Sequence, residues 1–135
     1  MLTTSSQAYL IPTVYSAYVG NWPYALLSLN LFASSQFYHR RYCKPTFIWD
    51  QTAIFAHWFY GLYLLSGHEW ADYIPYAVVS LYMWTIFYGG KVTKTMCFGP
   101  RADIWHSTVH LSSSLALVLT QHNLTRELAA QCLPP

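Results

Sequence analysis

Long stretches of this chain contain no charged side chain. Asp, Glu, Lys and Arg are absent from residues 1–38, 51–68, 73–90 and 104–125. Apolar runs of about 17–25 residues have the length that a helix needs to cross the hydrocarbon core of a bilayer. These runs lack the strict alternation of apolar and polar positions that is typical of strands. The pattern therefore predicts an all-α, polytopic transmembrane helix bundle.

Turn-forming residues divide these runs into five expected helices. Gly20-Asn21 precedes Pro23, and proline is favoured in the first turn of a helix. Pro45, Gly67 and Gly89-Gly90 interrupt the pattern further along, and we read each as a loop or a helix end. The expected helices span residues 5–19, 23–42, 49–66, 70–88 and 101–122, with a loop over residues 43–48.

The composition strengthens the membrane prediction. Hydrophobic residues make up 54% of the 135 positions and charged residues only 9%, whereas soluble domains are about 25% charged. So few charges cannot cover a water-facing surface of this size. We expect one transmembrane domain over residues 1–135, in the endomembrane system or the mitochondrial inner membrane. The net charge of +2 is too small and too scattered to indicate nucleic-acid binding.

Basic residues indicate the orientation of the helices. Arg40, Arg41 and Lys44 follow the second expected helix, and Lys91 and Lys94 follow the fourth. Five crossings place both of these regions on the same side, which the positive-inside rule assigns to the cytosol or matrix.

Five polar residues fall at this same side of the bundle. Ser35 and His39 end the second expected helix, Asp50 begins the third, and His106 and His110 begin the fifth. Residues four apart lie on one face of a helix, so each pair presents its side chains together. Polar groups at membrane depth are costly, and each therefore requires a partner or a function.

Three imidazoles and an open fourth position suit a catalytic zinc ion. Asp50 could then accept a proton from water, and Ser35 could donate a hydrogen bond to an oxyanion. A structural interpretation stays open beside this one. A His-x-x-x-His pair arises by chance, an aspartate stabilises a helix N-terminus, and a serine allows close helix packing. His57, deeper in the third expected helix, fits either a hydrogen-bonded interior position or a proton relay.

The spacing of these residues resembles a known superfamily. Ser35-x-x-x-His39, Asp50 and His106-x-x-x-His110 are similar to the signature of the CREST membrane hydrolases. That superfamily contains the alkaline ceramidases, the progestin and adipoQ receptors and the myomaker-like proteins. The resemblance implies that His39, His106 and His110 bind Zn²⁺, that Asp50 orients a water molecule, and that Ser35 assists.

The chain departs from that family in its number of helices. The family has seven, and here one helix instead of three separates the Asp50 helix from the His106 helix. The loss of two helices keeps the histidines at one face but removes much of the wall around a lipid cavity. We therefore expect a second copy of the chain or another protein to replace that wall.

Two functions follow from these observations. The first is a membrane-embedded, zinc-dependent hydrolase of a lipid amide or ester, similar to the ceramidases. The alternative is a non-catalytic accessory subunit of a larger membrane complex, which keeps the ancestral fold and with it the zinc site.

Overall fold

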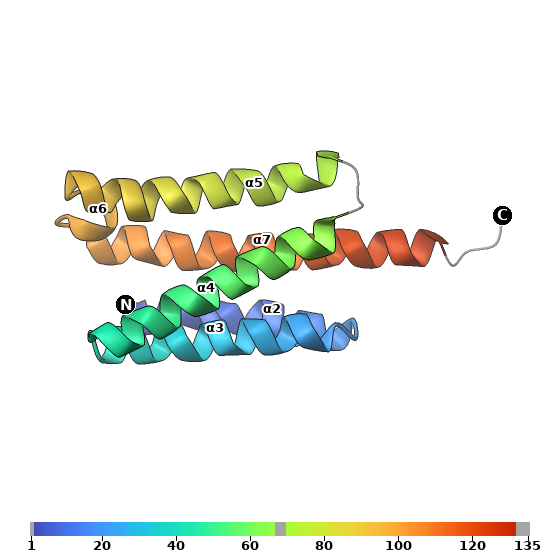
Figure 1. Cartoon of the computed structure of the whole chain (residues 1–135), viewed down its shortest axis with the longest axis horizontal. Helices are drawn as coiled ribbons and strands as arrows, with labels where there is room; N and C mark the ends of the chain where they lie inside the picture. Colours follow the sequence, from blue (N-terminus) through green and yellow to red (C-terminus); the bar gives the residue numbers. More distant parts are fainter. Residues whose placement is uncertain (1, 67–69, 132–135) are drawn as a thin grey trace.

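Five helical segments make up residues 2–66 and 70–131, which are the residues described in the computed structural model (Figure 1). In this part of the chain, all regular secondary structure is helical, as expected from the sequence. The elements are α1 (Leu2–Ser5), η1 (Ser6–Tyr9), α2 (Leu10–Tyr18), α3 (Trp22–Arg40), α4 (Lys44–Leu65), α5 (Trp70–Trp84), η2 (Thr85–Gly89), α6 (Gly90–Thr93), η3 (Met96–Phe98) and α7 (Ala102–Gln131).

The first segment is a helical rod with a change of winding. α1 and α2 are joined by the single 3₁₀ turn η1. Pro12 lies four residues after Ala8, and a proline ring excludes the ordinary α-helical bond to the carbonyl at that distance. The first helical segment begins at Leu2, three residues before the expected start.

The helix α4 begins five residues earlier than expected. Pro45 marks the first turn of α4 and not a loop over residues 43–48. Cys43 is the N-cap, and the Thr46 hydroxyl accepts a hydrogen bond from its backbone N–H. Proline fits the first turn because the N–H groups there have no partner within the helix. The early start places Asp50 in the second turn of α4.

The expected end at Gly89-Gly90 is also wrong. The chain passes through the π-helical turn η2 into α6, and leaves the helix at Lys94 with φ 54°. A Cβ atom on Gly90 would lie 2.8 Å from the carbonyl oxygen of Thr95. Gly90 therefore allows the following loop to pack closely, and it does not terminate the helix. The expected turn at residues 67–69 lies outside the described residues.

The helices lie along one long axis, with the N-terminal ends of α4 and α7 near the C-terminal end of α3 (Figure 1). α4 crosses the bundle diagonally, from α3 at its start to α5 at its end. The helix α7 continues to Gln131, nine residues beyond the expected end at residue 122. A central core joins Tyr9, Tyr24, Leu31, Ala53 and Leu117 from α3, α4, α7 and η1.

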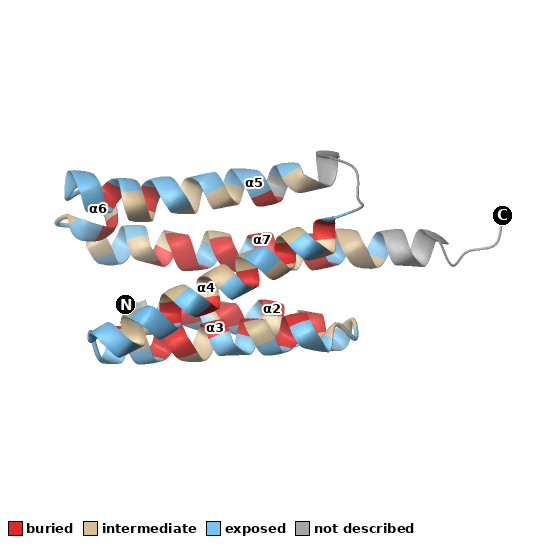
Figure 2. Ribbon diagram, viewed as in Figure 1, coloured by how far each residue is buried: buried red, intermediate tan, exposed pale blue. Residues whose placement is uncertain are grey.

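Buried positions face the interior of the bundle (Figure 2), and many of them hold polar side chains, whereas many large apolar side chains are exposed. Buried polar residues include Ser6, Ser16, Ser28, Ser34, His57, Ser113 and Gln121. Exposed apolar residues include Leu26, Phe59, Val78, Leu81, Leu111 and Leu115. Apolar and polar residues thus share the buried positions of the described helices.

Within the described residues, none of the helices combines the length and the apolar character that crossing a bilayer requires.

Candidate metal centre

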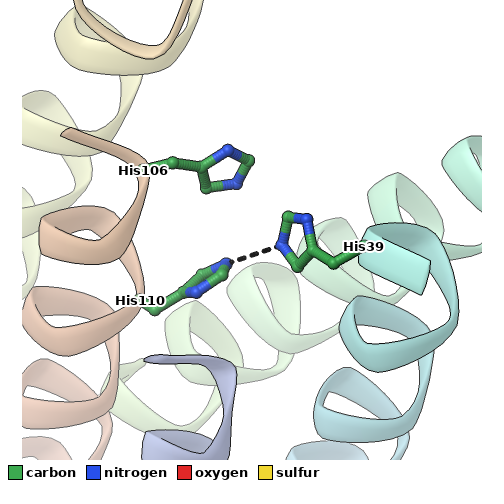
Figure 3. Close-up of side chains that lie close together, drawn as sticks. All are labelled: His39, His106 and His110. Carbon is green, nitrogen blue, oxygen red and sulfur yellow. Dashed lines mark hydrogen bonds between the residues drawn. The ribbon is translucent and has the colours of Figure 1, made fainter. Parts of the chain in front are cut away.

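Three imidazoles from two helices meet at one end of the bundle (Figure 3). His39 lies in the last turn of α3, and His106 and His110 lie one turn apart near the start of α7. Their ring centroids are separated by 4.8, 4.9 and 5.0 Å, so they form a nearly equilateral triangle. We call these three residues the histidine triangle.

The separation of the nitrogen atoms fits a shared metal ion. Nε2 of His39 and Nε2 of His110 lie 3.2 Å apart, and one ligand atom from each of the three rings falls within 4.8 Å of the others. Two nitrogens bound to one tetrahedral zinc ion at 2.0–2.1 Å would be about 3.3 Å apart. His39 and His110 thus have the spacing of two zinc ligands, and the nitrogen atoms of His106 lie close enough to make it the candidate third ligand.

A hydrogen-bonded histidine pair accounts for only part of this arrangement. One imidazole N–H could be shared between the Nε2 atoms of His39 and His110. His106, however, meets both rings through ring packing, and Nδ1 of His39 is buried without a hydrogen-bond partner. A buried polar atom without a hydrogen bond is costly, and a metal ion shared by the three imidazoles would also account for their convergence.

Aromatic rings enclose the histidine triangle. Tyr9 packs its ring edge-on against His110, and Phe87 packs edge-on against His106. Tyr38 lies beside His39. These contacts restrict the rotation of the imidazoles and keep bulk water away from them.

Ser35 lies at the triangle, as the sequence predicts. Its Oγ is 3.4 Å from Nε2 of His110, and the residue is buried in α3. At that distance the contact is weak, but it places the hydroxyl next to the His110 nitrogen that faces His39.

Asp50 lies at the edge of the same site. The residue is buried, at 5% exposure, and its Oδ1 accepts a hydrogen bond of 3.3 Å from Ser34 Oγ. It borders one cavity together with Ser35, His106 and His110. The structure therefore brings the five residues selected from the sequence to one end of the bundle.

The cavity beside the triangle has a volume of about 90 Å³. Its walls come from α3, α4, α5, η2 and α7, and they are largely apolar and aromatic. Ile54, Phe55 and Trp58 contribute from α4, and Val79, Met83 and Trp84 contribute from α5. Side chains from these elements line the space beside the site, and that space is small.

Three polar contacts at the site involve residues that are not among those predicted from the sequence. Ser34 binds Asp50, Ser5 Oγ lies 2.9 Å from His110 Nδ1, and Tyr88 Oη donates to Gln51 Oε1 over 2.8 Å. Ser34 could have been recognised, because its neighbour Ser35 was selected from the same turn. The other two contacts join segments far apart in the chain.

Cys43 is an exposed thiol in the loop between α3 and α4. Hydrogen bonding to Thr46 lowers the pKa of its thiol. A thiolate binds zinc, so Cys43 would contribute to the zinc content or zinc affinity measured for this protein.

No protein-family model, curated protein or solved structure matches this chain.

Proposed function

We propose that this protein is a membrane-embedded, zinc-dependent hydrolase that cleaves a lipid amide or ester. The observation that carries the proposal is the histidine triangle, which adjoins a buried serine, a buried carboxylate and an apolar cavity. The resemblance of these residues to the CREST signature supports the same assignment, because those hydrolases combine a serine, an aspartate and three histidines at this spacing.

His39, His106 and His110 would hold the zinc ion. A zinc ion bound by three imidazoles lowers the pKa of water to about 7 and polarises a carbonyl group. The rest of the reaction depends on side chains of this chain.

Asp50 is the proposed general base. Its carboxylate borders the cavity beside His106 and His110, where it can accept a proton from the attacking water. The water oxygen joins the acyl carbon, the bond to the leaving nitrogen or oxygen breaks, and Asp50 returns the proton to that atom. Ser34 orients the carboxylate through its hydrogen bond to Oδ1.

Ser35 is the proposed oxyanion donor. Its hydroxyl lies on the cavity wall next to His110, close to where the substrate carbonyl would approach. A hydrogen bond to the developing negative charge stabilises the transition state more than the ground state.

The cavity supports a substrate with an apolar chain. A space of about 90 Å³ would hold the scissile group and its nearest methylene groups, but not a whole lipid. Its opposite walls, Phe55 on α4 and Trp84 on α5, pack as tilted rings with centroids 6.0 Å apart. The remainder of the lipid would therefore have to lie outside this cavity.

The distribution of side chains supports the membrane setting. Leu81 on α5 is 69% exposed, while the serines of the interior are buried. Outward apolar side chains suit a hydrocarbon solvent, and inward polar side chains such as Ser28 and His57 bond to each other between helices.

The test is metal content and lipid cleavage on the same preparation. Wild-type protein in detergent or nanodiscs is expected to contain about one zinc per chain and to hydrolyse a fluorescent fatty-acyl amide or ester. The Asp50→Asn variant should keep its zinc and lose activity by about 10²- to 10⁴-fold. The His106→Ala variant should lose both.

A wild-type protein without stoichiometric zinc would overturn the metal site and the enzyme together. Zinc with no cleavage across acyl amides and esters would overturn catalysis alone.

The second candidate function is an accessory subunit of a membrane complex. An exposed apolar face on α2, made of Leu10, Ile11, Val14 and Tyr18, favours it, because a partner protein would cover such a face. Extraction in mild detergent separates the two functions. The subunit should migrate with a large complex, and the enzyme as a monomer or a small oligomer.

A further inference from the structure

The N-terminal segment reaches the histidine triangle through a serine hydroxyl. Ser5 is the last residue of α1, and its Oγ lies 2.9 Å from Nδ1 of His110. Nδ1 is the ring nitrogen that does not face His39, since the contact between His39 and His110 joins their Nε2 atoms. Ser5 thus binds His110 on the side away from the centre of the triangle.

We infer that Ser5 is a positioning residue for the zinc ligand His110, and that Gln36 holds the N-terminal segment in place for this contact. The inference rests on the proposed zinc site. It adds a residue that lies outside the five-residue signature.

The tautomer of His110 is the basis of the inference. A neutral imidazole carries one N–H and one lone pair, and a metal binds the lone pair. When Nδ1–H donates to Ser5 Oγ, the lone pair remains on Nε2 and faces His39. Histidine ligands of metals usually donate their second N–H in this way, which fixes both the tautomer and the ring orientation.

Gln36 connects this contact to the rest of the site. Its Nε2 donates to the carbonyl oxygen of Thr3 over 2.6 Å and to Ser6 Oγ over 2.9 Å, which uses both amide hydrogens. Gln36 is buried in α3, three residues before His39. One turn of α3 therefore supplies a triangle histidine and also holds the residues on either side of Ser5.

His39 shows the contrast. Its Nδ1 is buried and has no hydrogen-bond partner among the described residues. Aromatic packing from Tyr38 restrains this ring, whereas His110 is restrained by a hydrogen bond as well. The Ser5 contact thus fixes the tautomer of one of the two ligands that already have the separation of a zinc pair.

The test compares zinc affinity in variants of the full-length protein, by competition with a chromogenic chelator. All variants carry Cys43→Ser, so that the exposed thiol does not contribute. Ser5→Ala is expected to weaken zinc binding by about 10- to 100-fold. Ser5→Thr keeps the hydroxyl and should bind zinc with the affinity of the parent protein. Thr4→Ala, at an exposed neighbouring position, should leave the zinc affinity unchanged.

Gln36→Ala provides an independent second variant. It leaves the Ser5 hydroxyl in place but releases the segment that carries it, so zinc affinity should also fall. Cobalt substitution gives a spectroscopic measure, because the visible absorption of tetrahedral Co²⁺ reports the ligand geometry. We expect the Ser5→Thr spectrum to match that of the parent, and the Ser5→Ala spectrum to differ.

Two results would overturn the inference, and they are distinguishable. Equal zinc affinity in Ser5→Ala and the parent would remove the role of Ser5 and leave the proposed function intact. A parent protein that binds no zinc would overturn both.

Discussion

Each imidazole of the histidine triangle is held by a different set of neighbours. His110 has a hydroxyl on Nδ1 and the edge of Tyr9, His39 has aromatic packing, and His106 packs against Phe87. A ligand with an outer hydrogen bond is more rigid than one held by packing alone. We therefore expect His110 to be the least mobile ligand and His106 to move most when a metal binds.

The Ser34 hydroxyl provides a prediction at the scale of one residue. Its hydrogen bond to Asp50 stabilises and orients a buried carboxylate, and bonds to charged groups contribute about 1.5–3 kcal/mol. Ser34→Ala should lower kcat by about tenfold or more and leave the zinc content unchanged.

The matched control for Ser34 is Ser112→Ala. The Ser112 hydroxyl binds only carbonyl oxygens of its own helix, α7, among the contacts described. Its substitution should leave kcat unchanged. Equal kcat values for the Ser34 variant and the wild type would contradict a role for Ser34 in placing Asp50.

The limits of sequence analysis at this scale are physical. Spacing of four residues places Ser35 with His39, and His106 with His110, because both pairs lie within single helices. Ser5 and His110 are 105 positions apart, and their contact depends on how the helices pack. Periodicity within one helix contains no information about such packing.

At the scale of the elements, α4 and α5 are inclined to each other and pack closely at one end. A Cβ on Gly61 would lie 2.8 Å from Tyr76 Oη, which donates to the carbonyl oxygen of Trp58. Toward the metal centre, long side chains connect α4 to α5 and η2, through the Phe55–Trp84 ring contact and the Tyr88–Gln51 hydrogen bond. The cavity lies on this wider side.

Gly61 and Gly89 provide a matched pair of substitutions. Gly61→Ala places a methyl group against the buried ring of Tyr76, and such overpacking costs about 1–3 kcal/mol. Gly89→Ala meets no atom within 4 Å and removes a residue of low helix propensity. Circular dichroism during heating should show a lower Tm for Gly61→Ala and an equal or higher Tm for Gly89→Ala. A tolerated Gly61→Ala would mean that the two helices do not pack closely there.

The sequence predicts the presence of the helices better than their ends. Apolar runs identify all five segments, because each long helix has a long hydrophobic surface. The sequence predicts that Pro45 and Gly90 interrupt helices. Pro45 instead lies in the first turn of α4, and Gly90 allows the following loop to pack closely. The same residue types serve both purposes, so the choice between them depends on the tertiary structure.

At the scale of the whole molecule, the proposal depends on what surrounds the apolar exterior. Leu81 on α5 is 69% exposed, and Val92 on α6 is 84% exposed beside Lys91. In a bilayer the first would face lipid tails, and the second would lie at the headgroups. In water both side chains would face the same solvent.

Arginine substitutions distinguish these settings. Leu81→Arg should cost roughly 2.5–3.5 kcal/mol in a membrane and reduce the fraction of protein that resists carbonate extraction. Val92→Arg should leave that fraction unchanged, because arginine is tolerated near headgroups. Wild-type protein released quantitatively by carbonate would contradict the membrane setting.

The central claim is that His39, His106 and His110 bind one zinc ion, and X-ray absorption at the zinc edge tests it most directly. The account predicts about one zinc per chain of the Cys43→Ser protein, with a shell of nitrogen and oxygen atoms at about 2.0–2.1 Å and the outer-shell scattering of three imidazoles. That signal should disappear in His106→Ala/His110→Ala. Zinc that is absent from the parent, or retained unchanged in the double variant, would contradict the account.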